Sequence, residues 1–132
     1  MENIARSENY YKNALVLAYL GDSVFTLMVR SFLVKKYDFK PNELNKKANS
    51  VVCARFQAEV MEQIKDALTE EERDIVMRAR NTHLSNNKAK NSTIQEYSLA
   101  TQFEALIGFW YLNKEQNKLD DLFEKYVVEK LW

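Results

Sequence analysis

The stretch from Ala14 to Val34, ALVLAYLGDSVFTLMVRSFLV, is almost continuously apolar and decides the fold. Its length is that of a membrane-spanning helix. Asp22 in its middle and Arg30 nearby argue against a membrane span, because each charge is unfavourable by several kcal/mol at the centre of a bilayer. In a soluble protein, a helix that is apolar on all sides is a buried central helix. We therefore expect a central core helix that carries Asp22 as a carboxylate in the core.

The rest of the chain predicts an all-α fold. Two glycines and one proline among 132 residues are too few for the turns of a multi-stranded protein. The length favours a single domain, residues 1–132. Thr69 with Glu72 three residues later forms a capping box that opens a helix. Helices are expected at residues 10–36, 42–67, 69–81, 94–112 and 114–131, with a loop at 82–92.

The charges are balanced overall but unevenly distributed. Nineteen Lys and Arg residues oppose nineteen Asp and Glu residues, so bulk charge does not predict nucleic-acid binding, and any such contact requires a local patch. The segment from Ile75 to Gln95 contains no acid and supplies such a patch. A lone cysteine and the lack of an apolar run among the first residues favour a reduced, cytoplasmic location.

An ionised carboxylate in the core needs a partner, since its burial is unfavourable by several kcal/mol. Asp22 has two ordinary explanations. It caps a helix that restarts at Ser23 after a break at Gly21, or it pairs with Arg30 two helical turns later. These structural roles stand beside a functional one.

The two glycines suggest that functional role. Gly21 is adjacent to Asp22, and Gly108 is one turn beyond Glu104. Glycine inside a helix commonly allows close approach of another backbone, so two helices that meet here would bring both carboxylates together. Paired carboxylates repel one another, and Mg²⁺ removes that repulsion by taking an oxygen from each. The pattern is typical of a site for phosphoryl transfer or phosphodiester hydrolysis.

Two motifs carry a resemblance to a known family. Leu17 to Val24 (LAYLGDSV) resembles the Leu-Gly-Asp signature of the ribonuclease III family, and Phe103 to Gly108 (FEALIG) is similar to its Val-Glu-Ala-Leu-Ile-Gly motif. The motifs stand in the same order as in the family, about 80 residues apart. The likeness covers nearly the whole chain and leaves no room for a double-stranded-RNA-binding domain. It is greatest to the short subfamily, Mini-ribonuclease III.

The resemblance implies the helical bundle of a ribonuclease III catalytic domain and a Mg²⁺-dependent endoribonuclease. Such an enzyme hydrolyses double-stranded RNA to 5′-phosphate and 3′-hydroxyl ends, here in the maturation of large-subunit (23S) ribosomal RNA. Asp22 and Glu104 would ligate Mg²⁺. Thr101 would not touch the metal but would form a hydrogen bond to a water that the metal binds. The larger enzymes have acids at the positions of Leu15, Ala18 and Thr101, so the number of metal ions stays open.

The resemblance also implies an RNA-contacting segment and a homodimer. The contact residues would be Arg78, Arg80, Asn81, Lys88, Lys90 and Asn91. Exposed apolar positions around 51–56 and along the first helix are candidates for the dimer seam, and a stimulating ribosomal protein is left open. The competing hypothesis is a non-catalytic helical RNA-binding or ribosome-assembly module.

Overall fold

The structure is a computed structural model that describes residues 6–85 and 92–132, and helices account for its regular elements. In chain order they are α1 (Ala14–Lys36), α2 (Pro41–Asn49), α3 (Ala54–Ile64), the short 3₁₀ helix η1 (Lys65–Ala67), α4 (Glu70–Ser85), α5 (Ser92–Leu112), α6 (Gln116–Leu122), the π-helical turn η2 (Phe123–Val127) and α7 (Val128–Leu131). The described residues contain no strand. The predicted all-α fold is confirmed.

The single helix expected at 42–67 is wrong, because the chain breaks between α2 and α3. Val51 follows a tight turn in which its N–H donates to the carbonyl of Ala48, and its side chain is fully buried. Cys53 then takes an extended conformation, with φ −156° and ψ 154°, before α3 begins. Burial of the β-branched Val51 therefore outweighs the continuity of one long helix.

Other boundaries differ by a few residues. The first helix begins at Ala14, capped by the Asn13 side chain, and turns replace the helix expected from residue 10. The expected loop at 82–92 is too long, since α4 continues to Ser85 and α5 starts at Ser92. The last helical stretch begins at Gln116 because Lys114 adopts a left-handed conformation (φ 58°) that ends α5.

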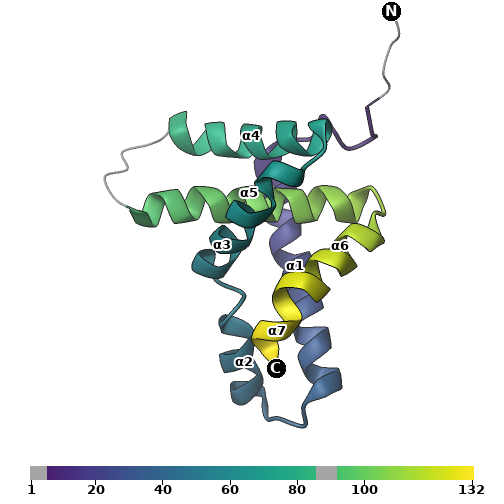
Figure 1. The fold of residues 1–132 in the computed structure, drawn as a ribbon, viewed down its shortest axis with the longest axis vertical. Coiled ribbons are helices and arrows are strands. Elements are labelled where there is room, and N and C mark those ends of the chain that lie inside the picture. Colours follow the sequence, from purple (N-terminus) through teal and green to yellow (C-terminus); the bar gives the residue numbers. More distant parts are fainter. Residues whose placement is uncertain (1–5, 86–91) are drawn as a thin grey trace, which may run out of the picture.

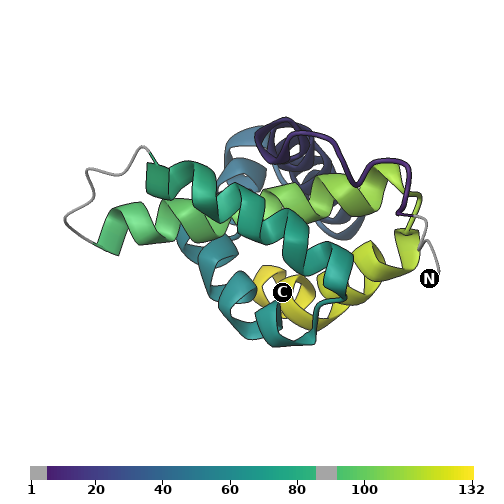
Figure 2. The same cartoon turned by 90° about the horizontal axis from the view of Figure 1, so that it is seen from above.

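The long helix α5 lies at the centre of the bundle. It runs alongside α4, crosses α1 and also packs on α3 (Figures 1 and 2). The core between α1 and α5 contains the edge-to-face pair Phe25 and Phe103, with ring centroids 5.1 Å apart and both side chains fully buried. Among the helices of the described residues, α1 and α5 share the most extensive contact.

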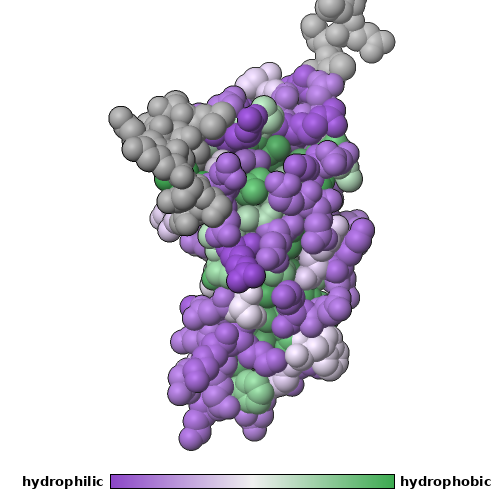
Figure 3. Space-filling view, turned by 60° about the vertical axis from the view of Figure 1, so that its left-hand side comes forward, coloured by the Kyte–Doolittle hydropathy of each residue, from purple (hydrophilic) through white to green (hydrophobic). Residues whose placement is uncertain are grey.

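The expectation that α1 is buried on all sides is wrong. Its length and composition would allow it to cross a membrane, but the core helix of a soluble protein meets the same two criteria. Eight of its residues are buried, whereas its outer side exposes Leu15, Val16, Tyr19, Leu27 and Val34. Figure 3 shows one face of the molecule, on which apolar residues reach the surface between polar ones. The central helix of the core is α5 and not α1.

Candidate active site

The two glycines lie where α1 and α5 cross, as the sequence predicted. A Cβ atom on Gly21 would lie 1.8 Å from the carbonyl oxygen of Glu104, and one on Gly108 would lie 2.1 Å from that of Leu17. Both distances are far inside van der Waals contact with backbone atoms. The helix backbones are therefore in direct contact, and only glycine fits at either position.

This crossing brings Asp22 and Glu104 together. Asp22 follows Gly21 directly, and the Glu104 backbone touches Gly21. Burial, the negative charge of Asp22 and a side-chain hydrogen bond with Asp22 together raise the pKa of Glu104 to about 8, and burial is the largest of these causes. When no cation is present, Glu104 therefore keeps its proton to a higher pH than an ordinary glutamate. The proximity of the two carboxyl groups, on which the predicted site depends, is a feature of the structure.

The pair lies at the rim of the crossing. Asp22 is exposed and Glu104 is half-buried, so the prediction that Asp22 is a carboxylate in the core is wrong. The reason is that α1 packs on α5 through its other side, with Leu17, Val24 and Phe25 buried. A position at the rim leaves one carboxylate open to solvent, where a large substrate can approach.

Neither structural explanation of Asp22 applies. The helix α1 is continuous through Gly21, so Asp22 does not cap a restarted helix. Among the described residues, the ion pairs do not include one between Asp22 and Arg30. The partner of Asp22 is Glu104, a group of like charge. Two carboxyl groups held together in this way are more typical of a ligand site than of a stabilising contact.

The donor set fits a hard divalent cation. Mg²⁺ commonly takes one or two protein carboxylates and fills its other positions with water and phosphate oxygens. The raised pKa of Glu104 comes first from burial and second from the negative charge of Asp22, and a cation bound to both groups would favour the ionised form against both effects. In the described part of the chain, no group of three or more His, Cys, Asp and Glu side chains is placed to hold a metal. Metal binding by Asp22 and Glu104 stays a prediction.

Thr101 lies one turn before Glu104 on α5 and is half-buried. Its hydroxyl donates to the carbonyl of Tyr97 at 2.9 Å, so the proton is engaged within the helix. Thr101 shares one side of α5 with Glu104, which lies three residues later in the chain. Its expected contact with a water near the metal stays a prediction.

Comparison with known proteins identifies the family. The family model described as "Ribonuclease III domain" matches residues 15–115 of this chain, and this range includes Asp22 and Glu104. The chain belongs to the ribonuclease III family.

Several curated relatives carry the name Mini-ribonuclease 3. The chain is similar to Mini-ribonuclease 3 of Staphylococcus aureus (39% identity, covering 93% of this chain and 94% of the relative). It is also similar to Mini-ribonuclease 3 of Brevibacillus brevis (41% identity, covering 94% and 91%). The crystal structure of a protein from Fusobacterium nucleatum superposes with a TM-score of 0.80 at 29% identity, covering 95% of this chain and all of that one. The predicted family and enzyme class, an endoribonuclease of ribonuclease III type, are confirmed.

Three of the six predicted RNA-contacting residues lie among the residues that the structure describes. Arg78, Arg80 and Asn81 lie in the last turns of α4, and Arg80 and Asn81 are exposed. Arg78 is half-buried and binds backbone carbonyls of the segment before α1. The other three predicted contacts, Lys88, Lys90 and Asn91, lie outside the described residues. An RNA contact stays a prediction for all six.

Sequence reasoning missed a polar network around Glu72, in which the carboxylate pair takes no part. The capping box is confirmed, with Thr69 N–H donating to Glu72 at 2.8 Å. Glu72 is also 4% exposed and accepts from Trp110 Nε1 at 2.8 Å and from the Lys118 ammonium. These partners lie about 40 residues away in the chain, which local sequence patterns do not reveal.

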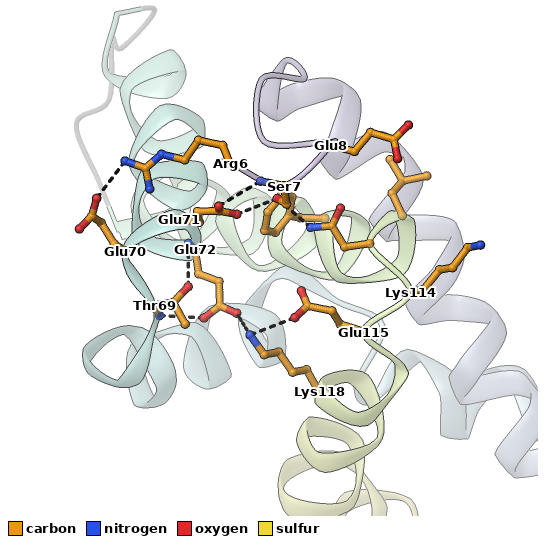
Figure 4. Close-up of a pocket in the computed structure, with 13 residues that line it drawn as sticks. Arg6, Ser7, Glu8, Thr69, Glu70, Glu71, Glu72, Lys114, Glu115 and Lys118 are labelled. Carbon is orange, nitrogen blue, oxygen red and sulfur yellow. Dashed lines mark hydrogen bonds and ion pairs between the residues drawn. The ribbon is translucent and has the colours of Figure 1, made fainter. Parts of the chain in front are cut away.

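This network borders a cavity of about 800 Å³ between the N-terminal segment, the start of α4 and the end of α5 (Figure 4). Neither Asp22 nor Glu104 lines it. Two of its carboxylates are engaged, Glu70 by Arg6 and Glu71 by Ser7. The polar groups that border the cavity hold the N-terminal segment and the start of α4 together.

Proposed function

We propose that this protein is a Mg²⁺-dependent endoribonuclease that hydrolyses double-stranded RNA and leaves 5′-phosphate and 3′-hydroxyl ends. The observation that carries the proposal is the contact between Asp22 and Glu104 at the α1–α5 crossing, in a chain of the ribonuclease III family. The two acids come from motifs that match the metal-binding positions of that family. Their geometry supports a shared cation and a substrate that approaches from solvent.

Asp22 and Glu104 would hold the cation between two rigid helices. When bound, Mg²⁺ supplies positive charge at the scissile phosphate and lowers the pKa of coordinated water. Glu104 must first release the proton that its raised pKa retains. The glycine contact fixes the spacing of the two carboxylates, so little reorganisation is needed when the substrate binds.

The physiological substrate that we propose is the precursor of 23S ribosomal RNA, processed in the cytoplasm by a single catalytic domain, residues 1–132. Support comes from the similarity to Mini-ribonuclease 3 proteins over nearly the whole chain. Double-stranded RNA is recognised mostly through phosphates and 2′-hydroxyls. The exposed Arg80 and Asn81 at the end of α4 are suited to such contacts.

We also propose that the active form is a homodimer that joins through the outer side of α1. Tyr19 is 83% exposed, Leu27 66% and Val34 65%, although each is a large apolar or aromatic residue. Large apolar residues exposed along one helix mark a protein interface more often than free surface, and on α1 they alternate with the exposed polar residues Asp22, Ser23 and Arg30. Two copies would place two carboxylate pairs in one particle, one for each RNA strand.

The decisive experiment compares cleavage of a short RNA duplex in Mg²⁺ and in EDTA, by the wild type and by Asp22→Asn and Glu104→Gln. We expect cleavage only by the wild type in Mg²⁺, with 5′-phosphate ends on the products. Each variant should lose at least a hundredfold in rate. If the wild type cuts no faster than the variants, the protein is a non-catalytic RNA-binding module instead.

A further inference from the structure

The residues before α1 form an N-terminal strap, residues 6–13, that lies along one side of α4. Arg6 pairs with Glu70 at 3.0 Å, the Ser7 hydroxyl donates to Glu71 at 2.7 Å (Figure 4), and the Tyr10 hydroxyl donates to Asp74 at 2.6 Å. Each of these pairs is separated by 64 residues, so the strap advances in step with the helix. The repeated contacts define a continuous clasp between the strap and α4.

Arg78 closes this clasp at its far end. Its guanidinium donates from Nη1 to the Lys12 carbonyl at 3.2 Å and from Nη2 to the Tyr10 carbonyl at 2.5 Å. It also lies 4.9 Å from the centroid of the Tyr10 ring, and Arg6 lies 5.1 Å from the same centroid. A planar guanidinium suits two carbonyls and a ring at once, whereas a lysine ammonium does not.

The geometry of the helix separates Arg78 from Arg80. Successive residues of an α-helix are about 100° apart, so side chains two positions apart diverge by about 200°. Arg78 faces the strap, and Arg80 therefore projects from the other side of α4, where it is exposed and its Nη1 donates to Met77 Sδ, a weak acceptor. One RNA duplex on one face of α4 cannot engage both arginines.

We propose that Arg78 is a positioning residue, which clasps the strap to α4 and so fixes the end of α4 from which Arg80 meets the RNA backbone. The proposal rests on the double-stranded-RNA substrate proposed above. It assigns different roles to two arginines that the sequence pattern groups together. The strap leads directly into α1, so the same clasp fixes the RNA-contacting end of α4 relative to the helix that carries Asp22.

The first test counts phosphate contacts. Binding of a short RNA duplex is measured in EDTA between roughly 50 and 200 mM salt for the wild type, Arg78→Met and Arg80→Met. Loss of a phosphate contact reduces the slope of log affinity against log salt by about 1. We expect that reduction for Arg80→Met. Arg78→Met should weaken binding several-fold at every salt concentration while the slope stays that of the wild type. A reduced slope for Arg78→Met would overturn the proposal.

The second test measures coupling through the clasp. Tyr10→Leu should raise KM for the duplex several-fold, and combining it with Arg78→Met should add little, because both variants open the same clasp. Arg73→Met on the same helix is the matched control, and its effects should add to those of Tyr10→Leu. Arg78→Lys, which keeps the charge but not the bidentate contact, should restore KM only in part. Additive effects of Tyr10→Leu and Arg78→Met would overturn the proposal.

Failure of the clasp can be distinguished from failure of the substrate assignment. The Tyr10 and Arg78 cycle is repeated on the free energy of unfolding, without RNA. If the wild type neither binds nor cuts the duplex, the proposed function fails. If the two substitutions show no coupling in unfolding, the clasp itself is absent and this inference fails whatever the substrate is.

Discussion

At the residue scale, Glu104 stands out because its raised pKa opposes stability at neutral pH. In the folded protein its pKa is about 8, against an ordinary value of 4.5. Between these values the folded state binds more protons than the unfolded state, so the free energy of unfolding falls as pH rises through this window. The contact between the two carboxylates therefore lowers the free energy of unfolding at neutral pH, as is common at functional sites.

We predict that Glu104→Gln removes this pH dependence. In metal-free buffer the variant should be more stable than the wild type at pH 8, by about 2 kcal/mol once solvent screening of a half-buried group is allowed for, and nearly equal at pH 5. Urea denaturation at both pH values measures the effect. Added Mg²⁺ should stabilise the wild type and not the variant. Parallel pH profiles of the two proteins would contradict the prediction.

Glu72 shows the opposite behaviour. Its burial raises the pKa, but hydrogen bonds from Lys118, the Thr69 backbone and Trp110 outweigh that effect, so the pKa is lowered overall. A lowered carboxylate pKa gives stability that is present above the ordinary pKa and is lost as pH falls through the folded value. This network therefore stabilises the fold at neutral pH and fails in acid.

We predict that Glu72→Gln destabilises the protein by about 2 kcal/mol at pH 7, because a buried hydrogen-bonded charge pair is broken. Glu115→Gln is the matched control, since Glu115 pairs with the same Lys118 at 3.3 Å in a more exposed position. Its effect should stay within about 0.5 kcal/mol. Chemical denaturation measures both, and equal effects would show that burial of Glu72 is unimportant.

At the element scale, the α1–α5 crossing determines both packing and chemistry. Because Gly21 and Gly108 each contact a carbonyl of the opposite helix, the two helices approach as closely as backbones allow. The carboxylate pair exists only at this separation. Any side chain at either glycine would move the helices apart and separate Asp22 from Glu104.

We predict that Gly21→Ala and Gly108→Ala each destabilise the fold by about 3 kcal/mol or more, because the new methyl group meets backbone that cannot shift without repacking the core. Variants that still fold should lose most Mg²⁺-dependent stabilisation. Asp121→Ala, at an exposed position of α6, is the control and should change stability by less than about 0.5 kcal/mol. Thermal unfolding with and without Mg²⁺ tests this, and wild-type stability of either glycine variant would refute it.

At the scale of the whole molecule, the exposed apolar side of α1 governs assembly. The dimer seam that the sequence placed around residues 51–56 is wrong in part, because Val51 and Phe56 are buried in the protein's own core. The first helix retains exposed apolar positions, and these carry the proposed seam. In a dimer, a second copy would cover these apolar side chains and remove them from water.

We predict that Tyr19→Glu converts the dimer into a monomer, because a charge would be buried at the seam. Light scattering after size-exclusion chromatography measures the mass. Met77→Glu, an exposed apolar position on α4, is the control and should leave the mass unchanged. A wild-type monomer, or a dimeric Tyr19→Glu variant, would exclude this seam.

The sequence by itself determined the helical fold and the identity of the two acids. Scarce glycine and proline predict helices, and a glycine next to Asp22 and another one turn from Glu104 predict where two backbones meet. These signals are local, since each depends on residues within about one turn. The break after Asn49, where Val51 enters the core, escaped prediction because burial overrides helix continuity.

The tertiary structure alone decided which side of each helix faces the core, and therefore which groups can act. It placed Asp22 at an exposed rim, left the outer side of α1 uncovered, and turned Arg78 toward the strap and Arg80 away from it. Each outcome depends on contacts between residues far apart in the chain. The side chains are fixed by the packing of neighbouring helices, and a single helical pattern does not encode which neighbour it will meet.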